Sequence, residues 1–150
     1  MNLPDTLTGA LEARAGRTDQ GHHVNYLAGE EQRRRVSIAE LRRTALGVLK
    51  RFQDFGIKAG DELIIFTSSN EQFIDGFWAC LLGGIVPVPV AVGISDDHRL
   101  KLLKIYHQLR RPFLYTEQGQ LDRLREFAAA AGSSADFEAL QAKALFVESL

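Results

Sequence analysis

Residues 62–92 of this 150-residue chain, ELIIFTSSNEQFIDGFWACLLGGIVPVPVAV, decide its fold. Residues 63–66 are continuously apolar, which is typical of a strand that is covered on both faces. After a polar turn, residues 70–82 predict a helix whose apolar side chains share one broad face: Phe73, Ile74, Phe77, Trp78, Leu81 and Leu82. A Gly-Gly pair ends this helix, and residues 85–92 supply a second apolar strand. The segment is therefore expected to be a β-α-β unit.

Two prolines mark the second strand of this unit. Pro87 and Pro89 lie two residues apart, so their missing N–H groups face the same side of the strand. That side cannot carry a normal ladder of hydrogen bonds, and we expect it at a sheet edge, at a bulge or near the strand end. The uncharged run 77–94 reaches the length at which a membrane span is considered. Its glycines and prolines would break a helix, so no membrane partner is predicted.

Helical and strand patterns alternate along the rest of the chain. The predicted helices cover residues 7–15, 38–55 and 96–109 and the region around 121–128, and the predicted strands cover residues 22–27, 34–36, 113–115 and 144–147. In the helix 96–109 the side chains expected to face inward are Leu100, Leu103, Tyr106 and Leu109. Strands that alternate with helices of this length indicate right-handed crossovers. We expect one α/β domain over 1–150, with a mainly parallel sheet and flanking helices.

Composition and charge exclude several classes of function. The chain is 45% hydrophobic and 25% charged, as in ordinary soluble domains, and its net charge of -1 gives no reason to expect a nucleic-acid partner. The single cysteine, Cys80, excludes an internal disulfide and is expected to be a small core residue. His22 and His23 point to opposite faces of a strand, so no metal site is predicted there. The N-terminus has no secretory signal pattern, so a cytoplasmic location is expected.

No complete active site can be found in the sequence, and we predict no catalytic residue. A phosphate loop with a lysine, a dinucleotide fingerprint and the order of a Ser/His/Asp triad are all missing. The best local candidate is the polar turn Thr67-Ser68-Ser69-Asn70, where a strand meets a helix. Open α/β sheets bind ligands at such strand ends. Ser69 or Asn70 could instead simply cap the helix, or one residue could do both.

Two segments together resemble core motifs of the adenylate-forming enzymes, the acyl-CoA synthetases, fatty acyl-AMP ligases and adenylation domains of peptide synthetases. The first is Ser37-Ile38-Ala39-Glu40-Leu41, which is similar to (S/T)-Y-x-E-L with Ile38 in place of the aromatic residue. Its serine and glutamate also form a capping-box pattern at a helix start. The first motif therefore combines a family resemblance with a structural role.

The second motif is LLGGIVPVP at residues 81–89, with Gly83, Gly84, Pro87 and Pro89 at the family positions. Amino-acid-activating domains typically continue this motif with an aspartate where the chain has Pro89. The proline form looks more like acyl-activating members. The segments 95–100 and 122–124 are reminiscent of fatty acyl-AMP ligase-like domains in polyketide and peptide synthases.

The resemblance implies a reaction that needs more residues than are present here. In the family a carboxylate attacks the α-phosphate of ATP, which gives acyl-AMP and pyrophosphate, and a thiol of coenzyme A or of a phosphopantetheine carrier protein then takes the acyl group. ATP and Mg²⁺ are implied for the whole enzyme, and we expect no cofactor to be bound by this region. The family's phosphate loop, adenine-binding segment and C-terminal lid lie downstream, so we expect these 150 residues alone to be inactive.

Three hypotheses follow from these observations. The first is the N-terminal subdomain of an acyl-adenylating ligase, which would brace the remainder of the ligase. Asn70, Phe73 and Phe77 are its candidates for lining the acyl pocket, although core packing explains both phenylalanines equally well. The second is a non-catalytic, ligase-like interaction module in a synthase assembly. The third is an unrelated flavodoxin-like binding domain, which the paired motifs disfavour.

Overall fold

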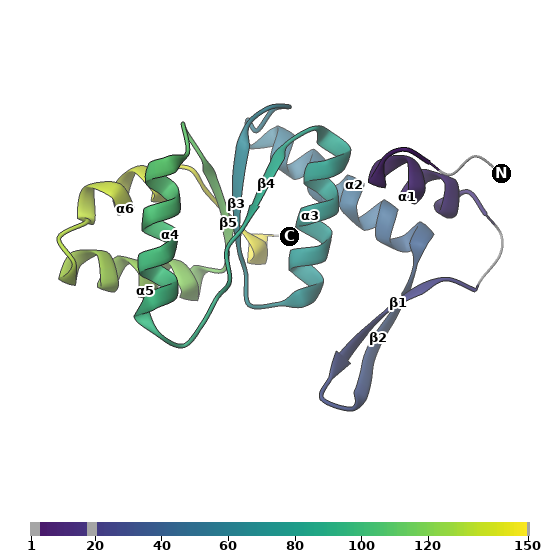
Figure 1. Cartoon of the computed structure of the whole chain (residues 1–150), viewed down its shortest axis with the longest axis horizontal. Helices are drawn as coiled ribbons and strands as arrows, with labels where there is room; N and C mark the ends of the chain where they lie inside the picture. Colours follow the sequence, from purple (N-terminus) through teal and green to yellow (C-terminus); the bar gives the residue numbers. More distant parts are fainter. Residues whose placement is uncertain (1–3, 18–20, 150) are drawn as a thin grey trace.

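The structure is a computed structural model that describes residues 4–17 and 21–149 (Figure 1). Its helices are α1 (Leu7–Ala15), α2 (Ile38–Asp54), α3 (Asn70–Gly83), α4 (Asp96–Gln108), α5 (Gln118–Ala130) and α6 (Ser134–Gln141), followed by a short 3₁₀ helix over Val147–Ser149. Its strands are β1 (His23–Ala28), β2 (Glu31–Ser37), β3 (Glu62–Phe66), β4 (Val86–Pro89), β5 (Phe113–Thr116) and β6 (Ala144–Phe146).

A four-stranded parallel sheet lies at the centre of the molecule, in the order β4-β3-β5-β6. Helices α2 and α3 cover one face of this sheet, and α4, α5 and α6 cover the other (Figure 1). The β-α-β unit predicted for residues 62–92 is β3-α3-β4. The predicted α/β class with a parallel sheet and flanking helices is confirmed.

The two outer strands of the sheet have different free edges. The N–H of Val86 donates to Asp61 and that of Val90 to Ile65, at 2.8 and 3.0 Å, so Pro87 and Pro89 face away from β3. Of the three positions predicted from the prolines, an edge, a bulge or a strand end, β4 occupies the sheet edge, and it is shorter than the predicted strand 85–92. On the far side of the sheet, the guanidinium of Arg51 donates to the outward-facing carbonyl of Phe146 on β6 at 3.3 Å.

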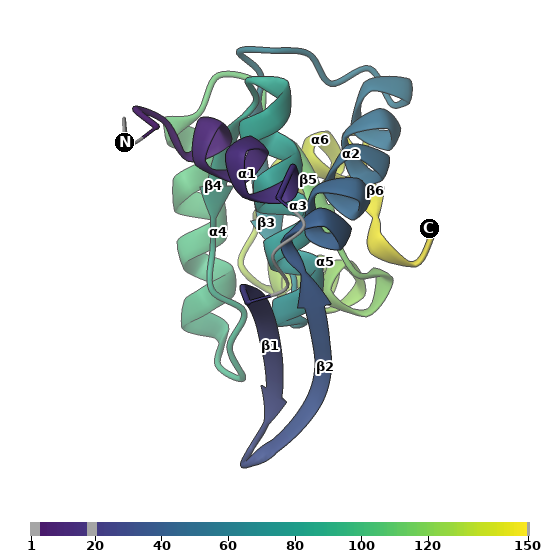
Figure 2. The same cartoon turned by 90° about the vertical axis from the view of Figure 1, so that its right-hand side faces the viewer.

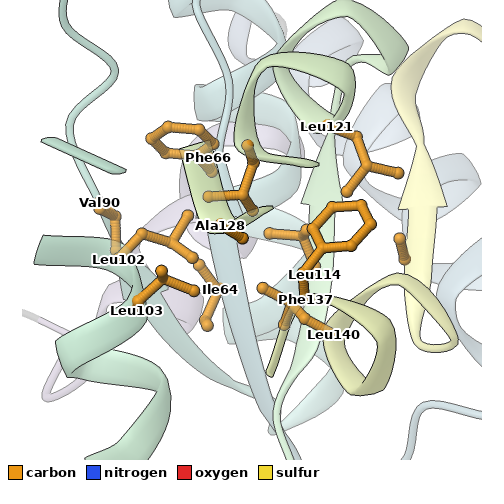
Figure 3. Close-up of a cluster of buried hydrophobic side chains, with 12 residues drawn as sticks. Ile64, Phe66, Val90, Leu102, Leu103, Leu114, Leu121, Ala128, Phe137 and Leu140 are labelled. Atoms are coloured by element: carbon orange, nitrogen blue, oxygen red, sulfur yellow. The ribbon is translucent and has the colours of Figure 1, made fainter. Parts of the chain in front are cut away.

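Each face of the sheet has its own hydrophobic core. Between the sheet and helices α4, α5 and α6, leucines from all three helices surround Ile64, Phe66 and Leu114 (Figure 3). On the opposite face Phe52 of α2 packs edge-on against Tyr115 of β5, with ring centroids 5.1 Å apart. The predicted core residue Cys80 is buried there. Strands buried on both faces explain why β3 reads as a continuous apolar run.

Helix α3 approaches its neighbours closely through two glycines. A Cβ atom on Gly76 would lie 2.9 Å from the ring of Tyr115, and one on Gly83 would overlap the side chain of Leu49 on α2. Gly84 ends the helix in the left-handed conformation at φ 66°, which favours glycine. The Gly-Gly pair of the second motif therefore has two different roles.

The first motif begins helix α2. The Ser37 side chain accepts from the Glu40 N–H at 3.1 Å, and the Glu40 carboxylate accepts from the Ser37 N–H at 2.9 Å. These bonds form the predicted capping box and lower the pKa of Glu40. Leu41 is buried against Leu11 of α1 and Val36 of β2. The motif thus fixes the point at which the chain leaves the hairpin and enters the body.

Strands β1 and β2 form an antiparallel hairpin that projects from the body (Figure 2). Strand β1 has the predicted length and is shifted by one residue, β2 is longer than the predicted strand 34–36, and the turn between them is centred on Gly29. Arg34 of the hairpin pairs with Glu71 of α3 at 2.8 Å and ties the two together. None of the helices in the part of the chain that the structure describes is long and apolar enough to cross a membrane.

Helix α4 corrects one prediction. Leu100, expected to face inward, is 41% exposed, whereas Arg99, Leu102 and Leu103 are the buried residues of this helix. These positions follow the i, i+3, i+4 spacing of one helical face, with an arginine at the position where an apolar residue was expected.

Helix α6 was not predicted, and it buries Phe137 and Leu140 over only eight residues. Such a short amphipathic segment has too few apolar positions to establish a period.

Candidate functional site

The site lies at the carboxyl ends of β3 and β5, where the winding of the sheet reverses. The chain passes from β3 to β4 on one side and then crosses to β5 on the other. Helix α3, which follows β3, covers one face, and α5, which follows β5, covers the opposite face. In open α/β sheets ligands bind in the crevice outside such a pair of strand ends.

The two strand ends are joined through Ser68 and Glu117. The Ser68 N–H and hydroxyl both donate to the same carboxylate oxygen of Glu117, each at 2.8 Å. The other carboxylate oxygen of Glu117 and the Thr67 hydroxyl are buried and have no hydrogen-bond partner among the described residues. Burying a polar group without a hydrogen-bond partner costs free energy. The Glu117 oxygen and the Thr67 hydroxyl in this crevice can therefore still form hydrogen bonds to a ligand.

Two roles were considered for the turn, capping of the helix and contact with a ligand, and Ser69 and Asn70 differ in which of them they can take. The Ser69 side chain caps α3, accepting from the Gln72 N–H at 3.4 Å. Asn70 is the first residue of α3 and is exposed. The Asn70 side-chain amide makes no hydrogen bond to any residue in the described ranges, 4–17 and 21–149. Capping therefore falls to Ser69, and Asn70 is left available for ligand contact.

A cavity of about 540 Å³ opens beside this turn. The hairpin contributes one wall and the start of α3 the other, with these lining residues: Asn25, Tyr26, Leu27, Arg33, Ser68, Ser69, Asn70 and Glu71. The ion pair between Arg34 and Glu71 lies next to it and holds the hairpin to α3. Hydroxyl, amide and phenol groups dominate the lining, which suits a polar or ionic ligand group.

Asp75, one turn beyond Glu71, adds a perturbed carboxyl beside the cavity. Burial raises the pKa of Asp75 to about 6, with Arg34 lowering it and Glu71 raising it. Burial also raises the pKa of Tyr26 to about 12, helped by Asp75 and Glu71. Both groups therefore favour their neutral forms more than free side chains do.

The structure separates the three residues predicted to line an acyl pocket. Asn70 lies on the cavity, whereas Phe73 and Phe77 stack on each other with centroids 6.0 Å apart and pack against the core of the α2/α3 face. Both rings remain partly exposed, and their role in acyl binding stays a prediction. Sequence reasoning missed Glu117, although its place directly after the strand 113–116 could have revealed it.

Metal binding finds no support in this region. Within the described parts of the chain, no three His, Cys, Asp or Glu side chains lie together in a way that could hold a metal ion. We assign no step to the Mg²⁺ that the family resemblance implies.

Comparison with known proteins identifies relatives of one kind. No protein-family model matches the sequence. A Caulobacter vibrioides (strain NA1000 / CB15N) protein provisionally named as an acyl-CoA synthetase is 28% identical over 132 residues, which cover 85% of this chain and 23% of that protein.

Solved structures agree with this relative. McyG A-PCP complexed with phenylalanyl-adenylate matches with a TM-score of 0.80 and 25% identity, over 99% of this chain and 26% of that one. The adenylation domain of a keto acid-selecting NRPS module bound to keto acyl adenylate matches with a TM-score of 0.77 and 26% identity, over 97% and 26%. A fatty acid AMP ligase from Legionella pneumophila, at 16% identity and a TM-score of 0.62 over 75% and 20%, shares the fold.

These matches agree with both sequence motifs. The chain spans about a quarter of the length of these proteins, 23% of the Caulobacter protein and 26% of the two adenylation-domain structures. Its fold corresponds to the N-terminal part of adenylation domains. The chain is therefore similar to members of the adenylate-forming, AMP-binding superfamily.

Proposed function

We propose that the chain is the N-terminal part of an acyl-adenylating ligase. The complete ligase would join a carboxylate to the α-phosphate of ATP, release pyrophosphate and pass the acyl group to a thiol of coenzyme A or of a carrier protein. The match to adenylation domains along 97–99% of the chain carries this proposal. The relative named as an acyl-CoA synthetase supports the choice of a carboxylate as substrate.

Within that ligase this region would act as a brace. The glycine contacts of α3 and the capping box of α2 fix two helices on one face of the sheet. The bonds from Ser68 to Glu117 fix the strand ends that open toward the cavity. A rigid wall of this kind holds a substrate in place without taking part in bond making. The atoms that neutralise the phosphates would come from the remainder of the ligase.

Asn70 is the residue of this chain that we propose to contact the substrate. It is exposed on the cavity at the start of α3, and Ser69 already satisfies the cap. Its amide can donate to one ligand oxygen and accept from another polar group. Phe73 and Phe77, one and two turns further along α3, would supply apolar contact to an acyl chain that extends along the helix.

The decisive experiment is carboxylate-dependent ATP–pyrophosphate exchange. We expect exchange from a gene product that contains this chain together with downstream family motifs, and none from residues 1–150 alone. In the exchange-competent protein, Asn70→Ala should lower kcat/KM for the carboxylate about tenfold, because one polar contact to the ligand is lost. Gln53→Ala, at an exposed position of α2 away from the cavity, is the matched control and should change nothing.

Two results would contradict the proposal. Exchange by the 150 residues alone would show that the missing parts are not needed. A complete gene product that binds a carrier protein but never exchanges pyrophosphate with any carboxylate would favour the interaction module instead. Equal loss of activity in Asn70→Ala and Gln53→Ala would remove the assignment of Asn70.

A further inference from the structure

A second cavity, of about 500 Å³, lies on the opposite side of the sheet between the β4–α4 loop, α4 and α5. Its lining residues are Val92, Gly93, Ile94, Arg99, Gln120 and Arg123, and it shares none of them with the cavity at the turn after β3. Gly93 lies so close to the ring of His98 that a Cβ atom there would overlap it. This contact holds the loop against α4.

Two polar side chains of low exposure, Arg99 and Gln120, line this cavity. Arg99 is only 9% exposed, and its Nε–H is buried with no hydrogen-bond partner in the described chain. Its one ion pair is to Asp96, at 2.9 Å, and the Asp96 side chain is 74% exposed. Gln120 is 8% exposed, and its amide is not among the fully buried polar atoms, so it meets solvent at the cavity and makes no hydrogen bond to any residue that the structure describes. A buried cation whose one partner is exposed is costly, so Arg99 would gain from an anion in the cavity.

The charge of the cavity favours an anion. Its lining contains two guanidinium groups, Arg99 and Arg123, and no carboxylate. Arg123 is exposed and forms no ion pair with a described residue, so its charge is available to a ligand. Asp96 and Glu126 face a separate, adjoining cavity that Arg99 and Arg123 also line. The carboxylates of Asp96 and Glu126 therefore offset the arginine charges in the adjoining cavity, and the 500 Å³ cavity remains positively charged.

We propose that this cavity binds the phosphate group of a small phosphate monoester. Arg99 and Arg123 would donate to its oxygens from α4 and α5, and the Gln120 amide would donate a third bond. Two guanidinium groups favour a dianion over a singly charged carboxylate, because each added charge gains a Coulombic partner. Phosphate in this position would satisfy the Arg99 Nε–H and the Gln120 amide together. This inference does not depend on the proposed ligase function.

The test is a titration of the ¹⁵N-labelled chain, followed through the arginine Nε–Hε resonances. Inorganic phosphate and phenyl phosphate are the probes, and acetate is the carboxylate comparison. We expect saturable shifts of the Arg99 and Arg123 resonances with both phosphates, and weaker binding of acetate. Arg123→Gln should weaken phosphate binding about tenfold, because a charge-assisted bond is lost.

Arg125→Gln is the matched control, because Arg125 lies on the same helix, pairs with Asp122 and lines neither cavity. It removes the same charge and should leave the phosphate affinity within about twofold. Equal weakening in Arg123→Gln and Arg125→Gln would show that only the general positive field attracts phosphate, and the site would be rejected. Acetate that binds as tightly as phosphate would overturn the assignment of the ligand, and shifts that never saturate would overturn the site itself.

Gln120→Leu gives a second test that keeps the volume of the buried side chain. We expect phosphate binding that is several-fold weaker, because the amide donor is removed, with little change in melting temperature. A folded variant that binds phosphate unchanged would show that this amide does not face the ligand.

Discussion

The two faces of the central sheet are packed in different ways. On the α2/α3 face an aromatic pair, Phe52 and Tyr115, meets a helix that approaches through Gly76 and Gly83. On the α4–α6 face, leucines and Ala128 fill the space, and Arg99 of α4 and Gln120 of α5 are also buried. Where an aromatic ring packs against a glycine, there is no room for an added atom. Leucine side chains can change rotamer and partly fill a space that a substitution leaves. We therefore predict that substitutions on the α2/α3 face destabilise the chain more than comparable substitutions on the α4–α6 face.

The largest effect should come from removing the aromatic pair. Phe52→Ala is expected to lower the free energy of unfolding by about 3–5 kcal/mol, because a fully buried ring leaves a cavity between α2 and β5. Leu102→Ala on the other face should cost about 2–5 kcal/mol and fall below Phe52→Ala. Urea unfolding of both variants measures the difference. A larger loss at Leu102 would contradict the view that the α2/α3 face is the stricter one.

Adding a single carbon tests the closeness of the glycine contact. Gly76→Ala places a Cβ atom 2.9 Å from the Tyr115 ring, and overpacking of this kind costs about 1–3 kcal/mol. That cost opposes the gain of about 1 kcal/mol from alanine in a helix, so a net loss of stability is expected.

Gly47→Ala on α2 is the control for this change, since a Cβ atom there meets nothing within 4 Å. It should raise the free energy of unfolding by up to about 1 kcal/mol. If both substitutions stabilise the chain, the contact between Gly76 and Tyr115 is looser than the structure indicates.

The starts of the helices on the two faces offer a smaller test. Ser37→Ala removes the capping box of α2 and should cost about 1 kcal/mol. Ser95→Ala at the start of α4 should cost less than about 0.5 kcal/mol, because the Ser95 side chain caps no backbone N–H. Equal losses in thermal unfolding of the two variants would show that the capping box carries no special weight.

The smallest effect is a dependence on pH at Asp75. Its pKa rises from 3.8 to about 6 on folding, so the folded state binds more protons than the unfolded state between these values. The stabilisation that this carboxyl provides is complete below pH 3.8 and is lost as the pH rises through about 6.

Urea midpoints measured from pH 4 to 8 should therefore show a small decline in the wild type that Asp75→Asn removes. Because Asp75 is partly exposed, solvent screens much of the effect. An Asp75→Asn variant that keeps the decline in full would assign it to another group.

The sequence predicted the elements that obey a strong local rule and missed those set by tertiary contacts. Apolar runs predicted β3 and β5, and the proline spacing limited β4 to a sheet edge, a bulge or a strand end, of which the structure shows the edge. Leu100 was placed on the wrong side of α4 because the buried position is taken by Arg99, which a hydrophobic pattern cannot reveal.

The candidate site likewise has one part that local sequence predicts and one part that depends on tertiary contacts. The polar turn 67–70 is visible in the sequence, because it lies between a strand and a helix. Its partner Glu117 is 49 residues away from Ser68, and only the pairing of β3 with β5 brings the two together. Asp75 was missed because burial and the nearby Arg34 perturb it, and neither is visible from local spacing.

The outer strands also determine how readily the sheet could pair with a strand of another chain. Because Pro87 and Pro89 turn their nitrogens outward, the free edge of β4 offers carbonyl acceptors and no N–H donor within the strand. A foreign strand placed there could complete only half of a ladder, so β4 is a poor template for intermolecular pairing. At β6, Arg51 already occupies the Phe146 carbonyl. The same prolines thus make this edge a poor site for pairing with a second chain.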